Sequence, residues 1–248
     1  MKYTTPGGPV YNLFLDMNNQ SHLLIAGASG SGKSVLVNGL ICTALHRFPG
    51  DADGSAEFIL IDPKRVELSQ YRHLPHVLRY STEPADMVDA LRYAIALTES
   101  RYKRMERVNA RKYWGSDVYV IIEELADLMT TNRREVQPLI QRLCQIGRAA
   151  KVHVWAITQT PVIAVIPTPI RVNFDGIVAL RTRSAQDSRN IIGQNGAETL
   201  PRYGECLFVS PDQRDAGRWV VPYIRENEQM ALIAWWENQN KKRWWKLW

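Results

Sequence analysis

Short apolar runs alternate with longer segments of helical periodicity along most of this 248-residue chain. Apolar runs rich in β-branched residues predict strands at 22–26, 57–61, 118–122, 152–158, 176–181, 205–209 and 217–223. Helical periodicity predicts helices at 33–47, 84–109, 134–149 and 226–239. This alternation is typical of an α/β fold in which a mostly parallel sheet is flanked by helices. In such sheets the ligand site lies at the carboxyl ends of the strands.

A glycine-rich loop joins the first predicted strand to the first predicted helix. The loop and the residue after it are Gly27, Ala28, Ser29, Gly30, Ser31, Gly32, Lys33, Ser34 and Val35. This is the phosphate-binding pattern G-x-x-x-x-G-K-S/T in the strand, loop and helix context that it requires. We expect backbone N–H groups to hold ATP, Lys33 to reach the β- and γ-phosphates, and Ser34 to bind Mg²⁺. A flexible Gly/Ser turn is the alternative interpretation.

Two carboxylates follow the apolar strand predicted at 118–122. We assign Glu123 to the Mg²⁺ shell and Glu124 as the general base that polarises the attacking water. The alternative is a helix start, because acids favour helix N-termini and Leu125 could begin a helix. Glu123 is one methylene longer than the aspartate that usually occupies this position.

The strand predicted at 152–158 also ends in a polar residue, Gln159. A glutamine at the carboxyl end of such a strand can orient water or contact the γ-phosphate, and we assign Gln159 to the catalytic set on that basis. The alternative is that Gln159 caps the following loop.

Composition narrows the class of protein further. The net charge of +6 and the pI near 9.3 favour a polyanionic partner. No apolar run approaches the roughly 18–20 residues needed to span a bilayer, and the N-terminus lacks a secretory signal pattern. The three cysteines, Cys42, Cys144 and Cys206, are far apart and odd in number, which predicts reduced core residues in a cytoplasmic protein.

Further blocks of sequence accompany the phosphate loop. They are His22–Leu24, Ile61–Leu68, Glu123–Leu128, Gly147–His153, Thr158–Pro161, Asp187–Arg189, Gly196–Glu198 and Gly204–Glu205. In this order the blocks resemble the motor domain of the FtsK/SpoIIIE-type DNA translocases, within the wider group that includes HerA. The resemblance extends over roughly residues 10–238.

The resemblance implies a RecA-like P-loop NTPase core that assembles as a homo-hexameric ring around double-stranded DNA, with ATP between neighbouring subunits. Matched by motif, Arg148 corresponds to the arginine that the family supplies across that interface. Such an arginine finger offsets charge on the transferring phosphoryl group. The alternative is a surface arginine near a helix C-terminus, where a positive charge is favourable.

The resemblance also implies that segments 162–172 and 184–204 face the DNA channel. Arg189 matches a DNA-contact position of the family, and three further arginines are assigned to DNA with it: Arg171, Arg183 and Arg202. Contacts of this kind hold phosphates without reading bases. The chain departs from the family pattern at Thr160, where an arginine is expected, and at Ala185, where a lysine is expected.

The domain organisation predicted from the sequence has three parts. Residues 1–20 are expected to be an irregular lead-in, and residues 21–240 to form the motor domain. Residues 241–248 form a basic, Trp-rich tail that we expect to dock on a membrane or a protein partner, which would place the protein at the membrane periphery. Stacking of the tail on single-stranded bases and a disordered tail are the alternatives.

The leading hypothesis for function is therefore an ATP-driven translocase of double-stranded DNA, in the service of a mobile element. The first alternative is a coupling or packaging ATPase that moves single-stranded DNA or protein in conjugation or phage assembly. The second is a ring-forming DNA clamp in which Glu123 has disabled hydrolysis.

Overall fold

The computed structural model describes residues 2–5, 8–12, 15, 17, 19–47, 56–162, 164–211, 213–221 and 223–244. Within these residues the strands are β1 Lys2–Thr5, β2 Gly8–Asn12, β3 Leu23–Ala26, β4 Ala56–Ile61, β5 Val77–Ser81, β6 Asp117–Ile122, β7 Val152–Thr158, β8 Gly176–Ala179, β9 Glu205–Ser210 and β10 Gln213–Val220. The helices are α1 Lys33–Arg47, α2 Pro84–Arg107, α3 Leu125–Ile146, α4 Thr168–Arg171, α5 Ala185–Ile192 and α6 Glu226–Trp244, with 3₁₀ turns at Ser69–Tyr71 and Ala197–Thr199.

All of these strands join one sheet in the order β1-β2-β10-β9-β8-β3-β7-β6-β4-β5. The run from β8 to β5 is parallel throughout, and β9 and β10 extend it as antiparallel strands. Because β3 lies inside the parallel run, between β8 and β7, the loop that follows it opens at the carboxyl edge of the sheet. The predicted α/β fold with a mostly parallel, helix-flanked sheet is confirmed.

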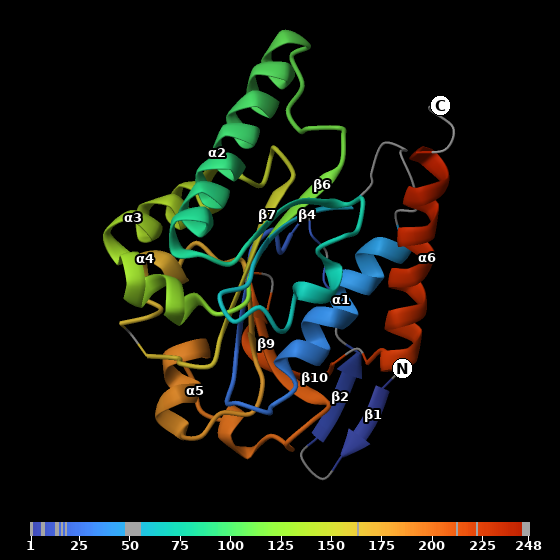
Figure 1. The fold of residues 1–248 in the computed structure, drawn as a ribbon. Coiled ribbons are helices and arrows are strands. Elements are labelled where there is room, and N and C mark those ends of the chain that lie inside the picture. The colour runs from blue at the N-terminus through green and yellow to red at the C-terminus, as the bar shows by residue number, and fades with distance from the viewer. Residues whose placement is uncertain are drawn as a thin grey trace.

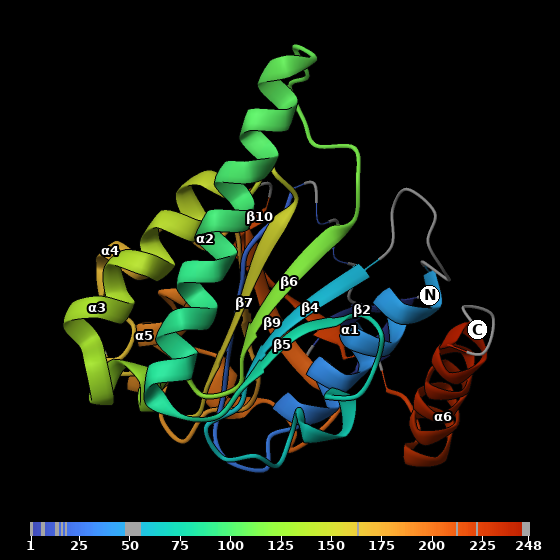
Figure 2. The same ribbon diagram turned by 45° about the horizontal axis from the view of Figure 1, so that its top comes forward.

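Helices cover both faces of the sheet (Figures 1 and 2). Side chains of the parallel strands alternate between two buried clusters, as the pleat requires. One cluster packs Leu24 and Val120 with apolar residues of α2 and α3, and the other packs Leu23 and Ile121 with residues of α1 and α6. The central strands are therefore buried on both faces, which explains their continuous runs of valine, isoleucine and leucine.

The structure corrects the expectation for residues 1–20. This segment was predicted to be irregular, but it contains the antiparallel pair β1–β2. Strand β2 then pairs in parallel with β10, with Tyr11 opposite Trp219 and Asn12 opposite Val220. The pairing is made with a strand some two hundred residues away in sequence, so local pattern does not reveal it.

Further elements differ from the sequence prediction. Strand β5 and helices α4 and α5 were not predicted; the Ser184 hydroxyl accepts a hydrogen bond from Asp187 N to begin α5, and Gly193 ends the helix at a φ of 80°. Helix α3 begins nine residues before the predicted start at 134, because it continues across a kink at Asn132, whose φ of −148° is non-helical. None of the helices in the described residues is long and apolar enough to cross a membrane.

Part of the tail prediction lies beyond what the structure describes. Helix α6 runs to Trp244, and residues 245–248 lie outside the described residues. The prediction that residues 241–248 dock on a membrane or a partner therefore stays a prediction.

Candidate nucleotide site

The glycine-rich loop has a backbone that only glycine adopts readily. Gly30 and Gly32 have φ values of 68° and 98°. A Cβ on Gly27 would lie 2.7 Å from Ser31 Oγ and 3.0 Å from Leu180 Cβ. Helix α1 begins directly after these glycines, so the N–H groups of its first turn, which have no acceptor within the helix, face the loop. This arrangement suits an anion.

Lys33 is buried inside the loop. Its Nζ donates to the carbonyl oxygens of Gly27 and Ala28, both at 2.8 Å. Burial lowers the pKa of Lys33 to about 8, against the opposing charges of Glu124 and Glu123. The Ser31 hydroxyl is also buried, and it has no hydrogen-bond partner among the described residues. A cation and an unpaired hydroxyl beside the N-terminus of α1 fit the phosphates of ATP.

Glu123 follows β6, which lies two strands from β3 in the sheet. Its side chain is buried, and Oε2 has no hydrogen-bond partner among the described residues. Burial raises the pKa of Glu123 to about 7, with Lys64 opposing the rise and Glu124 adding to it. Glu123 lines one small cavity together with Ser34, Asn38 and Glu67. Carboxylate and hydroxyl oxygens are ligands that Mg²⁺ prefers, so these residues fit the predicted metal site.

Glu124 begins a helix, as the alternative interpretation of its position predicted, and its role as general base stays a prediction. It is the N-cap of α3, where Oε1 accepts a hydrogen bond from Ala126 N at 3.3 Å. The same oxygen accepts from Thr158 Oγ1 at 2.7 Å, and Gln159 N lies 3.3 Å from both carboxylate oxygens. The cap and the end of β7 together hold this buried carboxylate at the carboxyl edge of the sheet.

Two contacts of Glu124 come from residues to which the sequence analysis assigned no role. Lys64 Nζ lies 3.4 Å from Glu124 Oε2 and 3.9 Å from Asp127 Oδ2. Burial opposes the charge on Lys64, but Glu124, Glu123 and Asp127 outweigh it and raise the pKa of the amine. The second residue is Thr158, whose hydroxyl contacts Glu124. In the sequence, Thr158 was marked only by its position next to Gln159, and Lys64 only by its position within the block Ile61–Leu68.

Gln159 lies next to the phosphate loop, as its assignment requires. It lines a cavity of about 240 Å³ together with Ala28, Thr160, Arg183 and Asp187. The structure therefore brings the glycine-rich loop, both glutamates and Gln159 to one edge of the sheet. It brings Arg183 there as well, from the segment that follows β8.

Arg148 lies at the other edge. It follows α3, a helix of 22 residues that begins at the nucleotide site and spans roughly 30 Å. The turn that carries it leads into β7 at the amino end of that strand. Arg148 is exposed and lines a cavity of about 360 Å³ with Arg111 and His153. It therefore cannot reach the phosphate loop of its own subunit.

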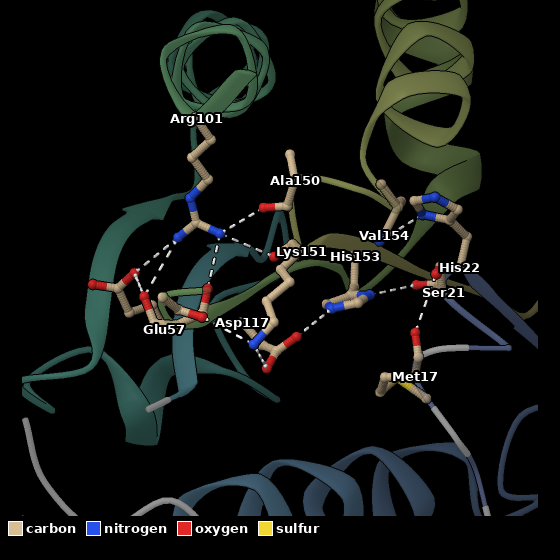
Figure 3. A network of polar contacts seen from close by, with 12 residues as sticks. Met17, Ser21, His22, Glu57, Arg101, Asp117, Ala150, Lys151, His153 and Val154 are labelled. Carbon is tan, nitrogen blue, oxygen red and sulfur yellow. Dashed lines mark hydrogen bonds and ion pairs between the residues drawn. The ribbon is translucent and has the colours of Figure 1, made fainter. Parts of the chain in front are cut away.

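A buried polar network holds the turn after Arg148 (Figure 3). Arg101, on α2, donates to the carbonyl oxygens of Ala150 at 2.8 Å and Lys151 at 3.1 Å. Its other nitrogen lies 3.5 Å from Glu57 Oε2. Lys151 in turn lies 3.5 Å from Asp117 Oδ2. The backbone beside Arg148 is therefore fixed by side chains of α2, β4 and β6.

The four arginines assigned to DNA lie in different surroundings. Arg171 is half-buried and donates to Asn190 O at 3.3 Å. Arg189 is exposed and donates to the side chain of Asn195 at 2.6 Å. Arg183 is exposed beside Gln159. Arg202 is exposed and points toward the phosphate loop, because its Nη2 lies 3.6 Å from the position of a Cβ on Gly30.

A phosphate loop on a mostly parallel sheet, with paired acids at the end of a nearby strand, defines a P-loop nucleotide-binding protein. The FtsK/SpoIIIE family profile matches residues 7–118 and 114–163, which is more than half of the chain. The chain belongs to the FtsK/SpoIIIE family of P-loop ATPases.

Similar proteins agree with this assignment. The chain is 36% identical to the DNA translocase FtsK of Treponema pallidum over 89% of its own length, and 32% identical to that of Rickettsia typhi over 87%. It spans only 29% and 34% of the length of those relatives. Its fold matches the pCW3 conjugation coupling protein TcpA with ATPγS, with a TM-score of 0.77 at 21% identity over 89% of this chain and 66% of that one. It also matches the Thermomonospora curvata type VII secretion ATPase EccC, with a TM-score of 0.70 at 20% identity over 87% of this chain and 28% of that one.

Proposed function

We propose that the chain is an ATP-driven translocase of double-stranded DNA that works as a homo-hexameric ring. The observation that carries this proposal is the convergence of Lys33, Glu123 and Glu124 at one edge of the sheet, in a chain whose relatives are named DNA translocase. Charge supports it as well, since a chain with a net charge of +6 suits a polyanion.

In this proposal each residue at the carboxyl edge has a role that follows from its contacts. The loop N–H groups and Lys33 bind the phosphates of ATP. Ser34 and Glu123 would hold Mg²⁺, which would neutralise phosphate charge. Glu124 accepts the proton of the attacking water, and Gln159 orients that water beside the loop.

Arg148 acts in the proposal on the nucleotide of a neighbouring subunit. Its position across the sheet from its own phosphate loop supports this, because a cation there can stabilise a phosphoryl group only in a second copy. Such an arginine raises the hydrolysis rate about 10³–10⁵-fold.

DNA binding is proposed for the exposed arginines at the carboxyl edge. Arg183, Arg189 and Arg202 would contact phosphates, and Arg171 would support α5 beside them. Binding should therefore weaken with salt, with a slope of log affinity on log salt of about −0.9 for each phosphate contact.

The test measures phosphate release with linear duplex DNA, together with displacement of a third strand from a triplex. We expect both activities, and we expect Glu124→Gln to abolish both. Glu99→Gln is the matched control, since Glu99 is an exposed glutamate on α2 that pairs with Arg142. Stimulation by single strands alone would favour the coupling ATPase instead. Duplex binding without phosphate release would favour the clamp.

A further inference from the structure

Four hydrogen-bond donors surround the Glu124 carboxylate and take up the acceptor positions that a general base needs for water. A carboxylate offers about four acceptor positions. Oε1 has Thr158 Oγ1 at 2.7 Å, with Ala126 N and Gln159 N at 3.3 Å. Oε2 has Gln159 N at 3.3 Å and Lys64 Nζ at 3.4 Å. No oxygen of Glu124 is left open toward a water molecule that it would deprotonate.

Only one of these donors can leave without breaking the fold. Ala126 N and Gln159 N are backbone groups of the first turn of α3 and the end of β7. Thr158 is fully buried. Lys64 differs, because its side chain is 43% exposed and its ammonium sits on a flexible four-carbon stem.

A second acceptor for Lys64 stands beside the first. Asp127 Oδ2 lies 3.9 Å from Lys64 Nζ, and the Asp127 side chain is 46% exposed. Both carboxylates belong to the start of α3, so a rotation of the lysine side chain suffices to move the ammonium from one to the other. The two positions of the cation differ in whether Glu124 Oε2 is occupied.

Occupation of Oε2 matters for the chemistry of the base. The Lys64 ammonium on Oε2 fills the lone pair that must point at water. A Glu124 paired with Lys64 is therefore idle, and a Glu124 whose Lys64 has moved to Asp127 is competent.

We propose that Lys64 is a positioning residue that holds Glu124 idle through an ion pair, and that transfer of this lysine to Asp127 releases Glu124 for hydrolysis. The proposal rests on the proposed function, because it assumes that Glu124 is the general base. It assigns a role in regulating the same site to Lys64 and Asp127.

The first experiment compares DNA-free phosphate release of Lys64→Met with that of the unaltered chain. We expect a rise of about two- to fivefold, the range by which an ion pair with one exposed partner shifts an equilibrium. Stimulation by duplex DNA should shrink by the same factor. Arg65→Met is the matched control, since Arg65 is in the same turn and pairs with Glu83 instead. Lys64→Arg should restore the low DNA-free rate.

The second experiment removes the other acceptor. Asp127→Asn should lower the DNA-stimulated rate about two- to fivefold, because the released position of Lys64 loses its partner. The double variant Lys64→Met with Asp127→Asn should behave as Lys64→Met alone. A residue that merely supported the fold would not give opposite signs at the two positions.

The outcomes separate this proposal from the proposed function. A DNA-free rate of Lys64→Met equal to or below that of the unaltered chain overturns the role of Lys64. Full activity of Glu124→Gln overturns the assignment of the base, whatever Lys64 does. The affinity of each variant for a fluorescent ATP analogue is measured alongside. It should stay unchanged, because the contact of Lys64 is with Glu124, the proposed general base.

Discussion

Two buried histidines at the amino ends of β3 and β7 show how single residues respond to their surroundings. His22 Nδ1 accepts a hydrogen bond from Val154 N at 3.1 Å, and burial lowers the pKa of His22 to about 3. His153 instead faces two acceptors, Ser21 O at 3.0 Å and Asp117 Oδ1 at 2.8 Å (Figure 3). Two neighbouring buried imidazoles therefore have different partners: His22 accepts from a backbone N–H, whereas His153 lies against a carbonyl and a carboxylate oxygen.

His22 predicts a pH dependence of stability. Its pKa is about 3 in the folded chain and 6.5 when unfolded, so between these values the unfolded state binds more protons. His22 should therefore cost about 2 kcal/mol of unfolding free energy when the pH falls from 7 to 5. Urea unfolding at the two pH values measures this, and His22→Asn, which keeps an acceptor for Val154 N, should remove the loss.

The control for this prediction is His46→Asn, which replaces an exposed histidine of α1. It should leave the pH dependence as it is. An unchanged pH dependence in His22→Asn would show that other groups, such as the buried His76, whose pKa burial lowers to about 4, account for the loss.

At the scale of elements, helix α3 joins two sites. Its first turn carries Glu124 as N-cap beside the phosphate loop, and its last turn leads to Arg148 at the far edge of the sheet. Tyr102 on α2 donates to Ile146 O at 2.9 Å, and Arg101 donates to the carbonyl oxygens of Ala150 and Lys151 in the turn that follows α3. Side chains of α2 therefore fix the last turn of α3 and the turn that carries Arg148.

Arg101 gives a prediction at this scale. Arg101→Met leaves the carbonyl oxygens of Ala150 and Lys151 without their buried donor, so it should lower the unfolding free energy by about 3 kcal/mol. Arg92→Met, on the exposed face of the same helix, should cost less than about 1 kcal/mol. Chemical denaturation of both variants tests this, and equal losses would contradict it.

At the scale of the whole molecule, the sheet separates Glu124 and Arg148 to opposite edges. For Arg148 to act on a nucleotide as proposed, a second copy has to be placed edge to edge, as in a ring of heterologous contacts. The proposed hexamer is thus consistent with where the two residues lie.

Mixing of inactive variants tests that arrangement. Glu124→Gln and Arg148→Ala should each reduce DNA-stimulated phosphate release about 10³-fold. A mixture of the two should recover activity, because a Glu124→Gln subunit supplies Arg148 to a neighbour whose Glu124 is intact. Mass measurements should first confirm that the two variants form mixed rings. If such rings recover no phosphate release, action of Arg148 across an interface is contradicted.

The features that sequence predicted well are those coded by neighbouring residues. The glycine-rich loop, the apolar strands around it and the two acids after β6 are each contained in a few consecutive positions. Their chemistry follows from residue type and spacing, and the parallel order of the strands brings their carboxyl ends together. The fold class could therefore be predicted from the chain alone, whereas the roles of the site residues stay predictions.

Tertiary structure alone decided the features that join distant residues. Lys64 meets Glu124 from sixty positions away, β2 pairs with β10, and Arg101 reaches the turn beside Arg148. Sequence pattern records which residues a segment buries, whereas these partners are selected by how the buried faces pack, which no local pattern contains.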